Sequence, residues 1–142
     1  MQRDQSLGYV VNHLARLMAG ALHDRIAPKG VVPGQFAQLL ALYERDGVTQ
    51  QELCEIVQVE QPTMANTLAR MERDGLIVRR PHPDDGRKQL IHLTKKARSL
   101  EATLIESAQE VNANATAGLS EADRARLMTL LAKVRTNLKE PS

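Results

Sequence analysis

The stretch GLIVRRPHPDDGRKQLIHLT, residues 75–94, decides the fold of this chain. Residues 76–80 are rich in β-branched side chains and predict one strand, and residues 88–93 predict a second. Between them, the Pro, Asp and Gly residues of segment 81–86 are typical of a turn. The stretch therefore predicts a β-hairpin in a chain whose other segments have helical patterns.

A short helix is expected shortly before the hairpin. Thr49, followed three residues later by Glu52, forms the S/T-x-x-E capping box that commonly begins a helix. This helix is expected to run to about Gln58. Its apolar face, which we expect to be buried, consists of Leu53, Ile56 and Val57.

A second helix follows after Glu60 and leads into the hairpin. Pro62 stands in its first turn, where a missing N–H costs nothing, and Asp74 with Gly75 ends it. Its apolar face consists of Met64, Leu68 and Met71. A helix–turn–helix followed at once by a hairpin is the element order of a winged helix.

Helical patterns also precede this unit. From Leu7 to Leu22 apolar residues recur at spacings of three and four, and Pro28 and Gly30 end the helix that they predict. Another helix is expected over residues 35–45.

Further helices are expected beyond the hairpin. Thr94 is expected to cap a helix that runs to about Asn112, and a break-prone stretch then extends to Gly118. Ser120, with Asp123 three residues later, begins a last helix.

The predicted fold is mainly α with a small β-hairpin, in a single domain over residues 1–142. Within it, residues 33–94 form the winged helix-turn-helix, flanked by dimerisation helices over about 7–32 and 95–139. A lone winged helix is shorter than this chain, and the apolar stripes of the flanking helices most simply bury one another across a two-fold axis. A dimer predicts a pseudo-palindromic operator with half-sites about one helical turn apart.

The second helix of the helix–turn–helix carries a polar face opposite its apolar one. A helix fits the major groove of B-DNA, where Asn and Gln can bond adenine, Thr can contact the thymine methyl, and Arg can bond guanine or a phosphate. The predicted DNA-contacting residues are Gln61, Pro62, Thr63, Asn66, Thr67 and Arg70. A polar face that is merely solvated is the alternative for this helix taken alone.

The hairpin supplies a second set of cations, of which Arg79, Arg87 and Lys88 are predicted DNA contacts. An arginine at such a tip can enter an A·T-rich minor groove, whose narrow width concentrates negative potential. One of Asp84 and Asp85 is expected to orient Arg87 or a backbone amide of the turn. His92 is expected to face outward from its strand. A solvated charged hairpin is the alternative.

Several segments resemble the MarR family of bacterial transcription regulators. They are VTQQEL (48–53), VEQPTMANTL (59–68), MERDGLIVR (71–79), DDGR (84–87) and IHLT (91–94). The resemblance implies that residues 61–70 are the recognition helix, that Arg87 is the wing arginine, and that the terminal helices hold a homodimer. Two positions depart from the family pattern: Glu60 stands where a serine-like N-cap is common, and Gly86 replaces a frequent basic residue.

The resemblance also implies a repressor that a small phenolic or carboxylate ligand releases from DNA. Such ligands typically bind between the dimerisation helices and the winged domain. The candidates in this chain are His13 and Arg16, one turn apart on the first helix. Arg16 offers a fork for a carboxylate, and His13 offers a hydrogen bond or a pH-sensitive charge. The alternative is that both are simply solvated.

Some members of that family sense oxidants through a cysteine, and this chain has a single one, Cys54. A sensor thiol needs exposure and a nearby cation, whereas Cys54 has Glu55 beside it and Glu52 two residues earlier. We expect a buried structural cysteine, and a redox-responsive regulator stays as the alternative.

Composition excludes several other classes of protein. Of the 142 residues, 42% are apolar and 25% charged, which is typical of a soluble globular protein, and the net charge of +2 neither requires nor excludes DNA. No run of residues is long and apolar enough to span a membrane, and the polar N-terminus is unlike a signal peptide, so a cytoplasmic location is expected.

The sequence also contains no catalytic Ser/His/Asp or Cys/His set, no glycine-rich phosphate loop and no metal-ligand cluster. An enzyme, a cofactor and a bound metal are therefore not expected. A winged-helix protein-interaction module remains an alternative. It predicts an affinity for DNA that hardly depends on salt, whereas a DNA-binding protein loses affinity steeply as salt rises.

Overall fold

The structure is a computed structural model in which residues 1–139 are described; residues 140–142, which the predicted domain includes, lie outside the described residues. The chain forms two compact units, one of residues 1–108 and one that begins at Gln109. The elements of the described part are α1 (Leu7–Ile26), α2 (Pro33–Glu44), α3 (Gln50–Val57), α4 (Gln61–Arg73), β1 (Ile77–Pro81), β2 (Gln89–Leu93), α5 (Lys95–Ser99), α6 (Glu101–Ala115) and α7 (Glu121–Lys139), with 3-10 turns at Arg3–Gln5 and Ala27–Lys29. The fold is mainly α with one antiparallel hairpin, as the sequence predicts.

Local signals in the sequence define the ends of α3 and α4. The capping box of α3 is present, because the hydroxyl of Thr49 accepts from the Glu52 N–H at 3.1 Å and the Glu52 carboxylate accepts from the Thr49 N–H at 3.2 Å. The helix ends at Gln58, which has a left-handed backbone with φ of 64°. Gly75, with φ of 76°, follows the end of α4.

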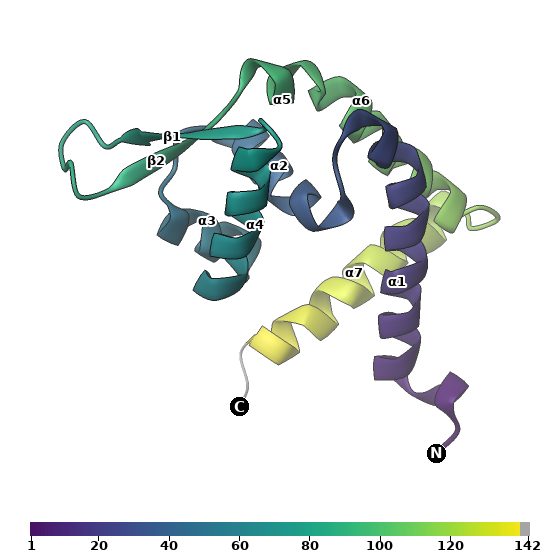
Figure 1. Cartoon of the computed structure of the whole chain (residues 1–142). Helices are drawn as coiled ribbons and strands as arrows, with labels where there is room; N and C mark the ends of the chain where they lie inside the picture. The colour runs from purple at the N-terminus through teal and green to yellow at the C-terminus, as the bar shows by residue number, and fades with distance from the viewer. Residues whose placement is uncertain (140–142) are drawn as a thin grey trace. The chain divides into compact units, whose positions relative to one another are not determined.

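The hairpin is attached to the helices rather than free-standing. Its strands pair in antiparallel register from Ile77 opposite Leu93 to Pro81 opposite Gln89. The loop before α3 joins β2 through a bridge between Val48 and Ile91, in which the Ile91 N–H donates to the Val48 carbonyl at 2.7 Å. Figure 1 shows the far end of the hairpin extending beyond α3 and α4.

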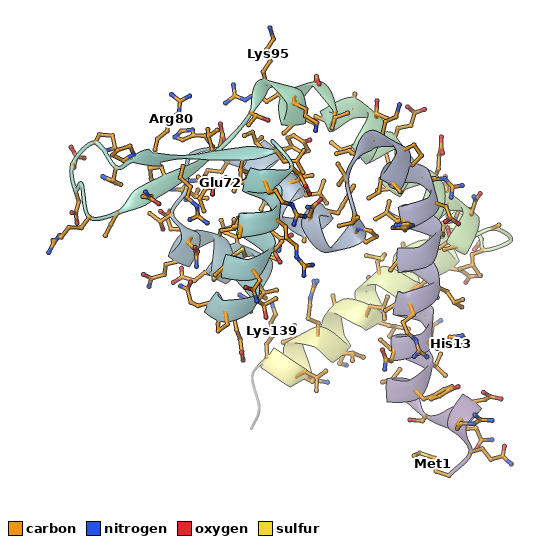
Figure 2. All side chains as sticks on the ribbon, in the orientation of Figure 1. Met1, His13, Glu72, Arg80, Lys95 and Lys139 are labelled. Atoms are coloured by element: carbon orange, nitrogen blue, oxygen red, sulfur yellow. The ribbon has the colours of Figure 1, made fainter. Side chains whose placement is uncertain are left out.

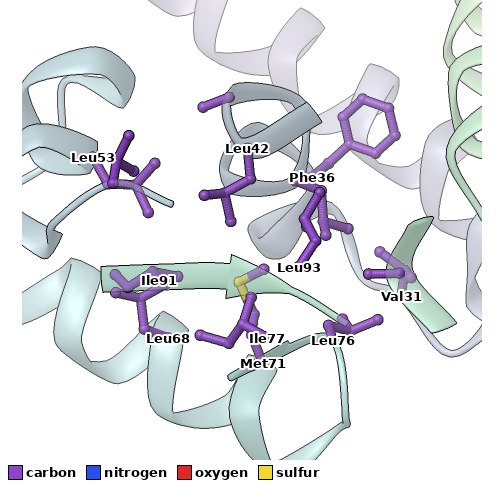
Figure 3. Packing of buried hydrophobic residues seen from close by; sticks show 14 of the residues in the cluster. Val31, Phe36, Leu42, Leu53, Leu68, Met71, Leu76, Ile77, Ile91 and Leu93 are labelled. Carbon is purple, nitrogen blue, oxygen red and sulfur yellow. The ribbon is translucent and has the colours of Figure 1, made fainter. Parts of the chain in front are cut away.

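One apolar core holds the helix–turn–helix and the hairpin together. Side chains from α2, α3, α4 and both strands meet in it, as Figure 3 shows for Leu42, Leu53, Leu68, Met71, Ile77 and Ile91. Met64, Leu68 and Met71 are fully buried, which confirms the predicted apolar face of α4. Burial of this face fixes the opposite face of α4 toward solvent.

Two expectations about the helices are wrong. Ile56 is 45% exposed rather than buried, because α3 is only two turns long and packs through the side that carries Leu53 and Cys54. The helix after the hairpin is interrupted at Leu100, between α5 and α6, and does not end near Asn112. It continues to Ala115 because residues 112–117 contain neither Gly nor Pro.

His92 also differs from the expectation that it faces outward. Its side chain is half-buried and its Nδ1 lies 3.5 Å from the carboxylate of Asp46. The imidazole covers Gly47 so closely that a Cβ at that position would lie 2.8 Å from it. The loop before α3 therefore packs against β2 through this histidine.

The second unit contains the last part of α6 and the whole of α7. The hydroxyl of Ser120 accepts from the Asp123 N–H at 3.1 Å, which confirms the predicted start of the last helix. Along α7 several large apolar side chains are exposed, namely Leu127, Met128, Leu130, Leu131 and Leu138. Over the residues described, no helix combines the length and the apolar character needed to cross a membrane.

Candidate nucleic-acid interface

The solvent face of α4 gathers most of the predicted DNA contacts. Gln61, Pro62, Thr63, Asn66 and Arg70 are exposed, and Thr67 is half-buried beside them. Thr63, Asn66 and Arg70 follow one another at spacings of three and four, so they lie along one side of the helix. A helix held by a buried face and presenting amide, hydroxyl and guanidinium groups has the chemistry that reads base edges.

A series of polar contacts connects the start of α4 with α3 and the hairpin. Nε2 of Gln50, the first residue of α3, donates to Oε1 of Gln61 at 2.9 Å. Oε1 of Gln50 accepts from Nη1 of Arg79 at 3.5 Å. Nε of Arg79 in turn lies 3.6 Å from the carboxylate of Glu72, near the end of α4 that leads into β1 (Figure 2).

Arg79 is therefore enclosed more than the sequence suggests. Its side chain is 23% exposed and is held by Glu72 and Gln50 on the side of the hairpin that faces the helices. The next residue, Arg80, is exposed on the other side of the hairpin (Figure 2). Alternation along the strand explains this difference, because successive side chains point to opposite faces.

The sequence pattern does not single out Gln50. A glutamine in the first turn of a helix is common and carries no signal of its own. The available clue was its position at the start of α3, eleven residues before the first residue of α4.

The turn of the hairpin presents Arg87, whose side chain is 92% exposed. The Asp85 carboxylate accepts from the Arg87 backbone N–H and from Nε, both at 3.1 Å, which confirms that one of the two aspartates orients this arginine. The hydrogen bond from the Arg87 side chain is the main reason why the pKa of Asp85 lies below its usual range. Lys88 is also exposed and follows directly.

A hollow of about 400 Å³ lies between the hairpin and the start of α3. Its walls combine three cationic side chains with amide and hydroxyl groups from the first turn of α3. The lining residues are Thr49, Gln50, Gln51, Arg79, Gly86, Arg87, Lys88 and Gln89. Cations beside a helix N-terminus favour an anion, so the hollow suits a backbone phosphate.

The two predicted ligand-binding residues lie on α1, away from these groups in the sequence. His13 and Arg16 are exposed and one turn apart. The His13 ring lies 6.2 Å from the ring of Tyr9, centroid to centroid, in a tilted arrangement. Their role in ligand binding stays a prediction.

Cys54 is buried in the core of the helix–turn–helix, which confirms the expected burial of this residue. Burial raises the pKa of the thiol, and the negative charge of Glu55 raises it further. Both effects oppose formation of the reactive thiolate.

A helix–turn–helix with an exposed polar face, followed by a hairpin with a cationic tip, defines a winged-helix DNA-binding protein. The model of the MarR family matches residues 29–88 of this chain. The uncharacterized HTH-type transcriptional regulator YwoH of Bacillus subtilis is 33% identical over 94 residues, which are 66% of this chain and 68% of that protein. The chain belongs to the MarR family, as its sequence motifs predict.

Solved structures agree with this assignment. A probable transcriptional regulator from Pseudomonas aeruginosa superposes with a TM-score of 0.86 at 28% identity, over 94% of this chain and 99% of that one. The transcriptional repressor CouR, bound to a 23-mer DNA duplex, superposes with a TM-score of 0.78 at 28% identity, over 93% and 94% of the two chains. The protein is thus a DNA-binding transcriptional regulator and not an enzyme.

Proposed function

We propose that this protein is a cytoplasmic homodimeric repressor of transcription. Each copy places α4 in a major groove of a pseudo-palindromic operator and Arg87 in the adjacent minor groove. A small aromatic or carboxylate ligand, bound near His13 and Arg16, releases the repressor from DNA. The observation that carries the proposal is the solvent face of α4, which is polar along its length and is fixed outward by a fully buried opposite face.

The exposed groups of α4 have distinct partners on base edges. Asn66 can bond the N6 and N7 positions of adenine together, Thr63 can contact the thymine methyl, and Arg70 can bond guanine or a phosphate. Arg87 lies in the turn with a side chain that is 92% exposed, so it is the natural minor-groove contact.

A homodimer is supported by the exposed apolar side of α1. The exposed apolar residues of this helix are Leu7, Tyr9, Val10, Val11, Leu14 and Leu17. A contiguous apolar stripe on a long helix is typical of an association surface, and a closed two-fold dimer is the commonest way to cover one. The exposed leucines of α7 offer a second such surface.

Repression of transcription is supported by the similarity to CouR, and release by a ligand is supported by the chemistry of two side chains on α1. CouR, which resembles this chain over almost its whole length, is a transcriptional repressor seen on DNA. Arg16 and His13 present a guanidinium and an imidazole one turn apart, which is a suitable pair for a carboxylate. A ligand bound on α1 next to the association surface can alter the spacing of the two copies of α4.

Selection of bound sequences from random duplex DNA tests this proposal. The wild type is expected to enrich a symmetric site, and Asn66→Ala is expected to relax the preference at one base pair in each half. Arg87→Ala is expected to lower affinity and to reduce the salt dependence of binding. A wild type that enriches no sequence, or binds with an affinity independent of salt, would contradict DNA recognition.

The ligand is tested on the enriched operator. A panel of small aromatic acids and phenols is titrated into the complex, and release is followed by fluorescence anisotropy. Arg16→Ala and His13→Ala are expected to retain DNA binding but to require more of the active compound for release. Release at the wild-type concentration in both variants would place the ligand elsewhere.

A further inference from the structure

The side-chain amide of Gln61 is held in one orientation. Glu72, Arg79, Gln50 and Gln61 are connected in that order, and the chemistry of the first two fixes the direction of each hydrogen bond that follows. The Glu72 carboxylate accepts, and the Arg79 guanidinium only donates. The atom of Gln50 that faces Arg79 is therefore its oxygen, and its Nε2 faces Gln61. Gln61 must then offer its oxygen to Gln50, and its own Nε2 lies on the other side of the amide.

This amide stands where a recognition helix meets the bases. Gln61 is the first residue of α4 and is exposed, and N-terminal residues of recognition helices contact base edges in the major groove. Gln50 is half-buried beneath it, at the first position of α3. A free glutamine amide can rotate to present either its oxygen or its nitrogen, whereas this one is held.

We propose that Gln50 is a positioning residue that determines specificity: it holds Gln61 so that a hydrogen-bond donor is presented to the major groove. This inference rests on the proposed function. The major-groove edges of guanine and thymine carry only acceptors, the edge of cytosine carries only a donor, and adenine carries both. The base that Gln61 contacts is therefore expected to be guanine, thymine or adenine, and cytosine is rejected.

Gln50→Glu reverses this arrangement without changing the size of the side chain. A carboxylate only accepts, so Glu at position 50 pairs with Arg79 through one oxygen and accepts from Nε2 of Gln61 through the other. Gln61 must then turn its own oxygen toward the groove. The bases accepted at its position are expected to change from guanine, thymine or adenine to cytosine or adenine, and the affinity for cytosine relative to guanine or thymine is expected to rise by roughly five- to tenfold.

The test is sequence selection with the whole chain of residues 1–142, in four variants beside the wild type. Gln61→Ala identifies the operator position that Gln61 reads, because the base preference there is lost. Gln50→Glu is expected to make cytosine accepted and guanine and thymine rejected at that position, and Gln50→Ala is expected to weaken the rejection of cytosine, because an unheld amide rotates. Gln51→Glu is the matched control: it adds the same charge on the neighbouring exposed residue of α3 and is expected to lower affinity for all sequences alike.

The outcomes separate this inference from the proposed function. If the wild type enriches no site, the proposed function itself fails. If the wild type enriches a site but Gln61→Ala leaves every position unchanged, Gln61 reads no base and the inference is overturned. It is also overturned if Gln50→Glu and Gln50→Ala, both folded by circular dichroism, keep the wild-type rejection of cytosine at the position that Gln61→Ala identifies.

Discussion

Tyr43 on α2 donates a hydrogen bond of 2.6 Å from its phenolic oxygen to the main-chain carbonyl oxygen of Ala97 on α5. Burial raises the pKa of this phenol to about 12, and the negative charge of Glu101 contributes in the same direction. The hydroxyl is therefore protonated and able to donate throughout the physiological range. The bond fastens α2 to the first helix after the hairpin.

Replacing Tyr43 by Phe is expected to lower the free energy of unfolding by about 0.5–1.5 kcal/mol, because the Ala97 carbonyl loses its side-chain donor while the ring packing is kept. Denaturant unfolding followed by circular dichroism measures the difference. Tyr9→Phe, on the exposed side of α1, is the matched control and is expected to change little. Equal losses in the two variants would show that the Tyr43 hydroxyl has no special role.

Asp46 should make stability depend on pH. Burial alone raises the pKa of this carboxyl, but the hydrogen bonds from the Leu93 N–H at 2.8 Å and from Arg98 at 2.5 Å, together with the charges of His92 and Arg98, hold it below its usual value. The unfolded state therefore takes up the proton first as the pH falls. The stabilisation is complete above the unfolded pKa and is lost as the pH falls through the lower folded pKa.

Asp46→Asn is expected to cost about 1.5–3 kcal/mol at pH 7, because hydrogen bonds to a charged acceptor are lost. It is also expected to flatten the decline in stability between neutral and acidic pH. Unfolding measured at a series of pH values tests both points. Asp24→Asn, at an exposed position of α1, serves as the control, and a pH profile of Asp46→Asn that parallels the wild type would contradict the assignment.

Cys54 should be inert toward oxidants in the folded protein, because the thiol is buried and its pKa is raised. Peroxide is expected to leave the affinity for the operator unchanged in the wild type and in Cys54→Ala alike. A thiol reagent should label the native protein much more slowly than the denatured one. Release of the wild type from DNA by peroxide, absent in Cys54→Ala, would instead establish a redox-responsive regulator.

Leu14→Glu tests the association surface on α1. Leu14 is 48% exposed, and a charge there is expected to convert the dimer to a monomer and to weaken operator binding by at least tenfold, since the two half-sites are no longer bound together. Sedimentation equilibrium gives the mass. Asn12→Glu, on the polar side of the same helix, should stay dimeric. A monomeric wild type, or a dimer that survives Leu14→Glu, would argue against this surface.

The elements of the winged helix could be predicted from local signals, because caps, glycines and β-branched runs act within a few residues. Burial was less predictable. Ile56 lies on the helical pattern of α3 but beyond the side that packs, and no local signal shows which part of a short helix faces the core. The contact between Gln50 and Gln61 was not predictable either, since it depends on how α3 and α4 meet in space.

The bridge between Val48 and Ile91 joins the hairpin directly to the loop that begins α3. We therefore expect the hairpin tip and α4 to keep a constant spacing. In a test operator, one base pair can be inserted between the bases proposed to contact α4 and the minor groove proposed to bind Arg87. Only one of these two contacts is then expected to form in each half-site. On the proposed function, the spacing between the two contacts contributes to the choice of operator together with the base sequence.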